Sequence, residues 1–198
     1  MGFYPVEAGT APYDAEYFAR YKAMASTPIG YQLSAARVNM VARHWDGPMI
    51  DVGIGSGAFI TARNALRADK NTFGYDVNPD ARDWLMERGL WRVPEIMDNL
   101  PVISLWDVLE HIPDFRPLLS RVRKFVFISI PIFTSGEHVL RSKHYRQDEH
   151  VWYFTTQGLI RVMFDCGFTC VESNTHETEL GREDIGSFVF QRDGDCKP

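Results

Sequence analysis

The stretch Asp51-Val52-Gly53-Ile54-Gly55-Ser56-Gly57 decides the fold that this sequence predicts. It begins in a short apolar run, residues 49–52, which indicates a buried strand, and it leads into a helical pattern over residues 58–68. Alternate glycines between a strand and a helix let the backbone turn tightly and let a ligand approach without meeting a Cβ atom. The stretch therefore predicts a nucleotide-binding turn, and a plain strand-to-helix connection is the weaker interpretation.

Short apolar runs alternate with helical patterns along the rest of the chain. Strands are predicted at residues 49–52, 72–76, 91–93, 102–106, 125–130, 169–172 and 187–190. Strands that alternate with helices form a mainly parallel sheet, whereas the last two strands are joined by a loop too short for a crossover helix and pair antiparallel. The expected fold class is α/β: a Rossmann-like, doubly wound, seven-stranded sheet, mostly parallel with the last strand antiparallel, preceded by N-terminal helices.

Two helix starts carry capping signals. Thr27 is expected to cap a helix that has Pro28 at its first position and runs to about Trp45. Asn78 is expected to open a second helix, which stops near Gly89. Ligands of doubly wound sheets bind where the parallel strands end, so the segments that come directly after the strands are the ones to search for function.

Length and composition indicate a globular protein of one domain. The chain has 198 residues, 45% of them hydrophobic and 24% charged, and no apolar run is long enough to cross a membrane. Its net charge of −5 argues against long nucleic acids and anionic membranes as partners. Three cysteines without a CxxC pair and the lack of a secretory signal favour reduced thiols, a cytoplasmic location and no metal cluster.

The expected organisation is a single domain, residues 1–198, with four parts. An N-terminal arm and helices occupy residues 1–46, and a cofactor-binding half occupies residues 47–131. A polar insertion at residues 132–154 is expected to form a substrate lid, and a C-terminal half comes after it at residues 155–198.

Two nucleotide cofactors fit the glycine turn. Asp76 ends the second predicted strand, where an acid accepts hydrogen bonds from a ribose diol. The spacing Gly53-x-Gly55-x-x-Ala58 also fits a dinucleotide fingerprint, which leaves an NAD-dependent oxidoreductase open as an alternative. Against it, Asp51 would face an anionic pyrophosphate and suits an ammonium group better, many residues precede the first strand, and the chain leaves no room for a separate substrate domain.

Four segments resemble motifs of class I S-adenosylmethionine-dependent methyltransferases, in particular the small-molecule group of the ubiquinone-biosynthesis type. Residues 51–57 resemble the loop that holds the methionine part of the cofactor, and residues 74–79 resemble the motif whose acid binds the ribose. Residues 106–113 and 152–156 resemble two later segments of that group. The resemblance covers roughly residues 30–190 and implies the seven-stranded fold, S-adenosylmethionine as the cofactor and methyl transfer (EC 2.1.1.-).

The resemblance also implies which residues bind the cofactor. They are Asp51, Gly53, Gly55, Gly57, Asp76, Val77, Asn78, Trp106 and Asp107. The family's acid or amide for the adenine is not evident; Asp98 and Asn99 are the candidates, with a turn into the next strand as their alternative role.

Histidines near the ligand edge are the candidate catalytic residues. The cofactor's sulfonium already activates the methyl group, so the enzyme mainly aligns a nucleophile about 3–3.5 Å behind it, and a base is needed only where a proton must leave early. His111 is the first candidate base because histidine titrates near neutral pH; the alternative is a histidine that orders the loop. His150 and His144, in the insertion, are the second candidates.

The remaining polar groups near this edge are expected to contact the substrate. Glu110 comes after the fourth strand, and the insertion carries Tyr145, Arg146 and Trp152 among many charged and aromatic residues. Loops of this length and composition in compact domains are often functional, although a solvated surface loop is the alternative.

Several substrate classes lack their motif in this chain. Residues 107–110 read Asp-Val-Leu-Glu, not the Asp/Asn-Pro-Pro-aromatic motif that grips a flipped base, and no Pro-Cys nucleophile is present. Asp107 stands without the further acids that a metal-dependent catechol enzyme needs, so no metal is expected. A small molecule methylated on a hydroxyl or an amine is the leading substrate. RNA or protein as the substrate, or a nucleotide-binding module without turnover, remain alternatives, and the oligomeric state is open.

Overall fold

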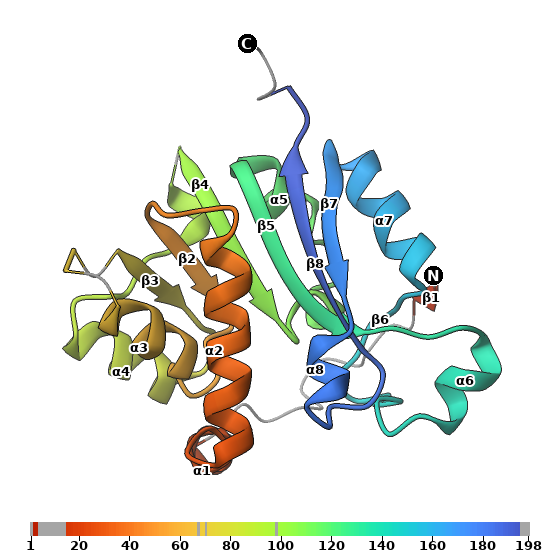
Figure 1. Cartoon of the computed structure of the whole chain (residues 1–198), viewed down its shortest axis with the longest axis horizontal. Coiled ribbons are helices and arrows are strands. Elements are labelled where there is room, and N and C mark those ends of the chain that lie inside the picture. Colours follow the sequence, from red (N-terminus) through yellow and green to blue (C-terminus); the bar gives the residue numbers. More distant parts are fainter. Residues whose placement is uncertain (1, 4–14, 67, 70, 98, 195–198) are drawn as a thin grey trace.

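A computed structural model describes residues 2–3, 15–66, 68–69, 71–97 and 99–194 of the chain. Its centre is a six-stranded sheet with the order β3-β2-β4-β5-β8-β7 (Figure 1). The strands are β2 (Met49–Val52), β3 (Thr72–Tyr75), β4 (Leu100–Trp106), β5 (Val122–Pro131), β7 (Phe168–Asn174) and β8 (Ile185–Arg192). β2 pairs in parallel with β3 and β4, β4 pairs in parallel with β5, and β8 runs antiparallel to both β5 and β7. The predicted α/β fold class, with the last strand antiparallel, is confirmed.

The strand predicted at residues 91–93 is reduced to a single bridge between Trp91 and Gly74. The backbone N–H of Gly74 donates to Leu90 O at 3.0 Å, and that of Arg92 donates to Gly74 O at 2.9 Å. Pro94 then begins the 3-10 helix η1 (Pro94–Ile96) and has no N–H to extend the pairing. The main sheet therefore has six strands, and the predicted seventh is shortened to this bridge at its edge.

A second, small sheet joins the beginning of the chain to the insertion. β1 (Gly2–Phe3) pairs antiparallel with β6 (Trp152–Tyr153), so these two N-terminal residues lie beside the end of the insertion (Figure 1).

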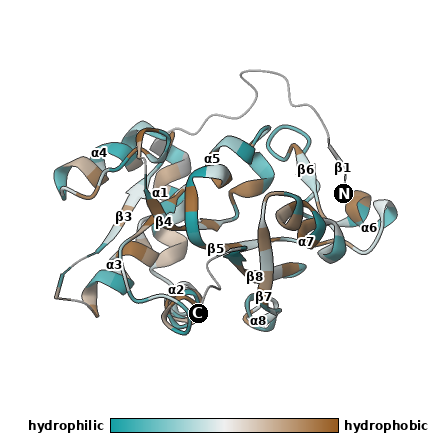
Figure 2. Cartoon of the chain, turned by 90° about the horizontal axis from the view of Figure 1, so that it is seen from above, coloured by the Kyte–Doolittle hydropathy of each residue, from teal (hydrophilic) through white to brown (hydrophobic). Residues whose placement is uncertain are grey.

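Helices cover both faces of the sheet. The side chains of α1 (Ala15–Ala25), α2 (Pro28–Ala42), α3 (Ala58–Ala65) and α4 (Pro79–Glu87) share one buried cluster with Val102 and Phe127. Those of α5 (Arg116–Arg121) and α7 (Thr156–Asp165) share the other cluster with Ile103 and Ile128. Consecutive strand residues thus point to opposite cores, as the period of two requires. Seen from above in Figure 2, β5 lies between α2 and α5.

The predicted helix starts are confirmed by their caps. Thr27 Oγ1 accepts a hydrogen bond from Gly30 N at 3.1 Å, with Pro28 at the first position of α2. Asn78 Oδ1 accepts from Asp80 N at 2.8 Å at the start of α4. α2 ends at Ala42, a few residues before the predicted end.

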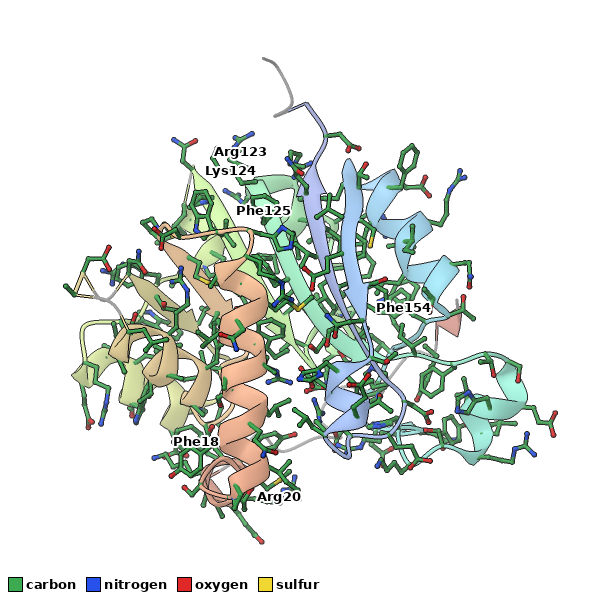
Figure 3. All side chains as sticks on the ribbon, in the orientation of Figure 1. Phe18, Arg20, Arg123, Lys124, Phe125 and Phe154 are labelled. Atoms are coloured by element: carbon green, nitrogen blue, oxygen red, sulfur yellow. The ribbon has the colours of Figure 1, made fainter. Side chains whose placement is uncertain are left out.

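The parallel strands end at the lower edge of the sheet in Figure 1, together with α1, α6 (Gly136–Arg141), α8 (His176–Glu179) and the 3-10 helix η2 (Leu109–His111). Figure 3 shows Phe18 and Arg20 at this edge, whereas Arg123 and Lys124 lie at the opposite edge, where β5 begins. Ligands of doubly wound sheets bind at the carboxyl ends of the strands, so the lower edge is where a site is sought. Among the described helices, none has the length and apolar composition of a membrane span.

The cap of α2 leads to a stability prediction. Thr27→Ala removes the acceptor of Gly30 N and should lower the free energy of unfolding by about 1 kcal/mol. Urea denaturation measures the change. Thr27→Ser keeps the hydroxyl and serves as the control, and equal losses in both variants would contradict a role for the cap.

Candidate functional site

The glycine turn between β2 and α3 is built in left-handed backbone. Gly53, Gly55 and Gly57 have φ values of 71°, 53° and 73°. A Cβ atom on Gly53 would lie 2.4 Å from Val108 Cγ2, so a side chain there is excluded twice, by conformation and by space. A Cβ atom on Gly55 would lie 3.5 Å from the ring of Tyr21, so α1 covers the turn. The turn thus has no side chains of its own at three positions, which lets other groups approach its backbone closely.

Asp51 brings an unpartnered carboxylate oxygen to the end of β2. Its side chain is buried, and its Oδ1 accepts a hydrogen bond from Ser104 Oγ at 2.7 Å. Its Oδ2 is also buried and has no hydrogen-bond partner among the described residues. Burial raises the pKa of Asp51 to about 8, although Ser104 and Arg37 act in the opposite direction. A cationic group of a ligand would satisfy this oxygen.

Asp76 joins the end of β3 to the glycine turn. Its Oδ2 accepts from Gly55 N at 3.3 Å, and its Oδ1 accepts from Asn78 N at 2.9 Å. Burial raises the pKa of Asp76, while these backbone N–H groups lower it. Asn78 is buried and acts through its cap on α4, whereas the Val77 side chain is 68% exposed. The two predicted cofactor motifs are therefore in direct contact.

Trp106 and Asp107 end β4 at the same edge. Trp106 is buried, packs edge-on against Phe59 at 5.3 Å and lies 5.0 Å from the Arg37 guanidinium. Asp107 has a φ of 58°, and its N–H donates to Ser129 O at 2.8 Å. These contacts hold both residues rigidly beside the turn.

Four buried or half-buried charges form a charge quartet: Arg37, Asp107, Glu177 and Arg182. Arg37 Nη2 donates to Asp107 Oδ2 at 3.2 Å, and Arg37 Nε donates to Glu177 Oε1 at 2.8 Å. Arg182 Nη2 donates to Asp107 Oδ1 at 3.0 Å, and Arg182 Nη1 lies 2.5 Å from Glu177 Oε2. Burial alone would raise the pKa of Asp107, but Arg182 and Arg37 hold it at about 2. Asp107 is therefore ionised, and each of its oxygens accepts a hydrogen bond from an arginine.

Arg37 is a site residue that the sequence analysis missed. It lies one helical turn after Leu33 and one turn before the buried Val41, on the inward side of α2. The sequence did carry a signal for this role, because a charged residue on the buried side of a helix requires a partner of opposite charge. That partner, Glu177, is 140 residues away and was not evident from spacing.

Glu110, His111 and His150 form a second buried group, the Glu–His–His cluster. Val151 N donates to Glu110 O at 2.9 Å, and His111 Nδ1 lies 2.9 Å from Glu149 O, so the end of the insertion lies along η2. The His111 and His150 rings meet edge-on with centroids 4.7 Å apart. One side-chain donor atom from each of the three residues lies within 4.8 Å of the others.

Burial keeps the Glu–His–His cluster uncharged. It raises the pKa of Glu110 well above the usual range, with the charge of Asp107 adding to the effect. It lowers the pKa of His111, and it lowers that of His150 to about 3. Two of the predicted histidines are thus brought together with Glu110 as neutral groups.

The side chains of the other predicted residues of the insertion have their main partners outside this cluster, although His150 N donates to Arg146 O at 2.8 Å. His144 Nε2 donates to Glu183 O at 2.8 Å, and Arg146 Nη1 donates to Glu149 Oε2 at 2.8 Å. Tyr145 packs against Tyr153 with ring centroids 5.8 Å apart. Trp152 Nε1 donates to Ile112 O at 3.0 Å, and its ring packs on Phe115 and Phe154 in the core. The candidate adenine ligand Asp98 lies outside the described residues.

Hydrogen bonds hold the insertion at its base and against the loop before β8. Phe133 N donates to Phe154 O at 2.9 Å, which closes the insertion at its base. His138 Nε2 and Ser142 Oγ each lie 3.1 Å from Asp184 Oδ2, in the loop before β8. The segment therefore leans on the same loop that supplies Arg182 to the charge quartet.

The chain is similar to known methyltransferases in sequence and in fold. A family model described as a methyltransferase domain matches residues 30–173. No curated protein sequence matches the chain significantly.

Three solved structures illustrate the likeness in fold. Magnesium protoporphyrin IX methyltransferase from Synechocystis PCC 6803, with bound SAH, is 13% identical with a TM-score of 0.61, over 90% of this chain and 95% of that chain. A protein described as a possible histamine N-methyltransferase from Thermotoga maritima is 14% identical with a TM-score of 0.62, over 89% and 97%. The methyltransferase-like partner of the Haloferax volcanii Trm112 activator is 13% identical with a TM-score of 0.65, over 89% and 94%.

The close contact at Gly53 leads to a prediction with a matched control. Gly53→Ala should lower the free energy of unfolding by about 1–3 kcal/mol more than Gly89→Ala, because both positions have left-handed φ but only Gly53 meets Val108. Urea denaturation compares the two. Val108→Ala combined with Gly53→Ala should recover part of the difference, and no recovery would contradict the steric explanation.

The raised pKa of Asp51 leads to a prediction about pH. Between its ordinary value of 3.8 and about 8, the folded state holds a proton that the unfolded chain has lost, so Asp51 makes stability fall as pH rises through this window. Asp51→Asn keeps the acceptor for Ser104 and removes the titration. The variant should gain stability relative to the wild type as the pH is raised from about 5 to about 8, and urea denaturation at both pH values measures this gain. If the free energy of unfolding changed equally with pH in the two proteins, Asp51 would not titrate in this window.

Proposed function

The chain belongs to the methyltransferase-domain family, the class I S-adenosylmethionine-dependent enzymes, and from that premise we propose that it methylates a hydroxyl or an amine of a small molecule. One observation carries the binding half of the proposal: a left-handed glycine turn is joined to Asp76 beside an unpartnered buried oxygen of Asp51. These groups fit the cofactor, which carries a ribose diol, an ammonium group and a sulfonium.

Each part of this edge has a role in holding the cofactor. Asp76 accepts hydrogen bonds from the ribose hydroxyls, and Asp51 Oδ2 accepts from the ammonium group. The glycine turn lets the backbone approach the methionine part. Asn78 positions Asp76 through its backbone N–H, which donates to Asp76 Oδ1, and its side chain caps α4. Val77 offers an exposed apolar side chain beside the ribose site, while Trp106 and Asp107 form the wall at the end of β4.

The transfer step needs alignment more than acid–base chemistry. The cofactor, when bound, supplies a methyl group activated on a sulfonium sulfur. The acceptor oxygen or nitrogen forms the new bond to the methyl carbon in line with the carbon–sulfur bond that breaks, and the sulfur keeps that electron pair. A proton on the acceptor must leave, and His111 is the proposed group to accept it. Its Nδ1–H donates to Glu149 O, which places the lone pair on Nε2.

The other two histidines have supporting roles. His150 packs edge-on against His111 and positions its ring. His144 lies in the insertion, and its ring is held by the backbone carbonyl of Glu183. We assign the insertion as the substrate lid, and its substrate contacts are Tyr145, Arg146 and Trp152. Glu110 lies beneath this lid, next to His111.

The charges of the lid favour a small molecule over RNA. Arg141, Lys143 and Arg146 are each paired with an acid, at 3.3 Å to Glu137, 3.4 Å to Glu183 and 2.8 Å to Glu149. A basic face for a phosphate backbone is therefore largely neutralised. Among the solved structures of similar fold, one is named as a magnesium protoporphyrin IX methyltransferase and another is described as a possible histamine N-methyltransferase, and both names refer to small molecules.

Cofactor binding tests the first half of the proposal. S-adenosylhomocysteine should bind the wild-type protein in calorimetric titration, and Asp76→Ala should weaken binding about 10- to 100-fold because two charge-assisted hydrogen bonds are lost. Asp80→Ala, which removes an exposed acid at the start of the same helix, is the matched control. NADH is titrated in parallel, and binding of NADH alone would refute the proposal in favour of a dinucleotide enzyme.

Turnover tests the second half. His111→Ala should leave S-adenosylhomocysteine binding intact and lower methyl transfer about 10²- to 10⁴-fold, the usual contribution of a positioned base. The assay measures S-adenosylhomocysteine formation with a panel of small hydroxylated and amine acceptors, and the exposed His176→Ala is the control. Unchanged turnover in His111→Ala would show that His111 is not the base.

A further inference from the structure

The Glu–His–His cluster has the composition of a metal site. We propose that Glu110, His111 and His150 bind one divalent first-row transition-metal ion at the carboxyl edge of the sheet. The three donor atoms come from two segments that are distant in sequence, η2 and the end of the insertion, and they converge within 4.8 Å. Donors on one ion, at about 2.0–2.2 Å from it, lie about 3–4 Å apart, so small side-chain rotations complete the site.

Glu110 supplies the strongest argument. Its side chain is 1% exposed, and neither of its carboxylate oxygens has a hydrogen-bond partner among the residues that the structure describes. A buried carboxyl without partners is costly, and native proteins rarely leave one unless a cation or a ligand completes it. The buried His150 Nδ1 also lacks a partner within the described part of the chain. A carboxyl group and an imidazole nitrogen that both lack partners therefore belong to one cluster, whose donor atoms converge within 4.8 Å.

His111 shows the second contact that is typical of metal-binding histidines. Such a histidine usually donates its other ring N–H to a carbonyl or a carboxylate, which fixes the tautomer and the ring orientation. His111 Nδ1 lies 2.9 Å from Glu149 O in this arrangement. The backbone contact of Val151 with Glu110 O holds the second segment at the same place.

The donor set determines which ions fit. Two imidazoles and one carboxylate suit zinc, iron, cobalt, nickel or manganese, whereas magnesium and calcium prefer oxygen ligands alone. Arg146 and Arg182 lie near enough to oppose a cation, but each is paired with acids, Glu149 for the first and Asp107 with Glu177 for the second. The surroundings are therefore close to neutral.

Three protein ligands leave coordination positions open for an oxygen of the acceptor. A bound ion lowers the pKa of a hydroxyl that it coordinates, and it would then replace His111 as the group that promotes deprotonation. This role in methyl transfer rests on the proposed function, whereas the binding of the ion does not.

Metal titration of the full chain, free of any affinity tag and stripped with a chelator, tests the site. Co²⁺ is the probe because its visible absorption reports nitrogen ligands and coordination number, and Zn²⁺ is added in competition. One Co²⁺ per chain should bind at micromolar concentration or tighter, Zn²⁺ should displace it, and Mg²⁺ in large excess should not.

Variants show whether the cluster is responsible. Glu110→Gln keeps the shape of the side chain and should weaken Co²⁺ binding about 100-fold or more; His150→Gln should do the same. His176→Ala removes an exposed histidine of α8 and should leave binding unchanged. Circular dichroism confirms folding of each variant. Absence of stoichiometric binding, or binding that Glu110→Gln leaves intact, would overturn the proposal.

Two further outcomes separate this proposal from the proposed function. A stripped protein that binds S-adenosylhomocysteine but not Co²⁺ refutes the metal site alone. A protein that binds Co²⁺ through the cluster but never binds S-adenosylhomocysteine refutes the methyltransferase proposal and leaves the metal site intact.

Discussion

The charge quartet holds the functional edge of this protein together. Arg37 comes from α2, Asp107 from the end of β4, Glu177 from α8, and Arg182 from the loop before β8. Each arginine contacts both acids, so removal of any member leaves a charge without its compensation. A lone buried charge costs several kcal/mol, whereas alternating signs with matched hydrogen bonds are tolerated. The four segments are therefore fixed to one another where the parallel strands end, and the glycine turn and the insertion are placed around them.

Asp107 and Glu110 are three residues apart, and their hydrogen-bond partners give them different protonation states. Asp107 receives two guanidinium groups and is ionised, with a pKa of about 2. Glu110 receives no side-chain hydrogen bond in the described structure, and burial together with the charge of Asp107 raises its pKa. The first acid has a structural role because both of its oxygens accept hydrogen bonds from arginines of the quartet. The second retains capacity for a ligand, and with His111 and His150 it carries the metal-site proposal.

Much of the fold was predictable because its signals are local. The caps at Thr27 and Asn78 act on N–H groups two or three residues away, and the glycine turn depends on φ angles that favour one residue type. The predicted strand at residues 91–93 is shortened to one bridge at Trp91 because Pro94 turns the chain into a 3-10 helix before pairing can extend. The sequence predicted that Asp76 and Gly55 lie near each other, because neighbouring parallel strands end at the same edge of a sheet. It did not predict the hydrogen bond between them.

The sequence by itself determined the order of strands and helices, the turn that prepares a nucleotide site, and the family to which the chain belongs. These depend on period, capping and steric rules that act over a few residues. Only the tertiary structure decided which charged groups are satisfied. It paired Arg37 with Glu177 and placed His150 against Glu110 and His111, at separations of 140 and about 40 residues. Burial and charge are sums over everything that surrounds a side chain, and most of those neighbours are contributed by distant parts of the chain.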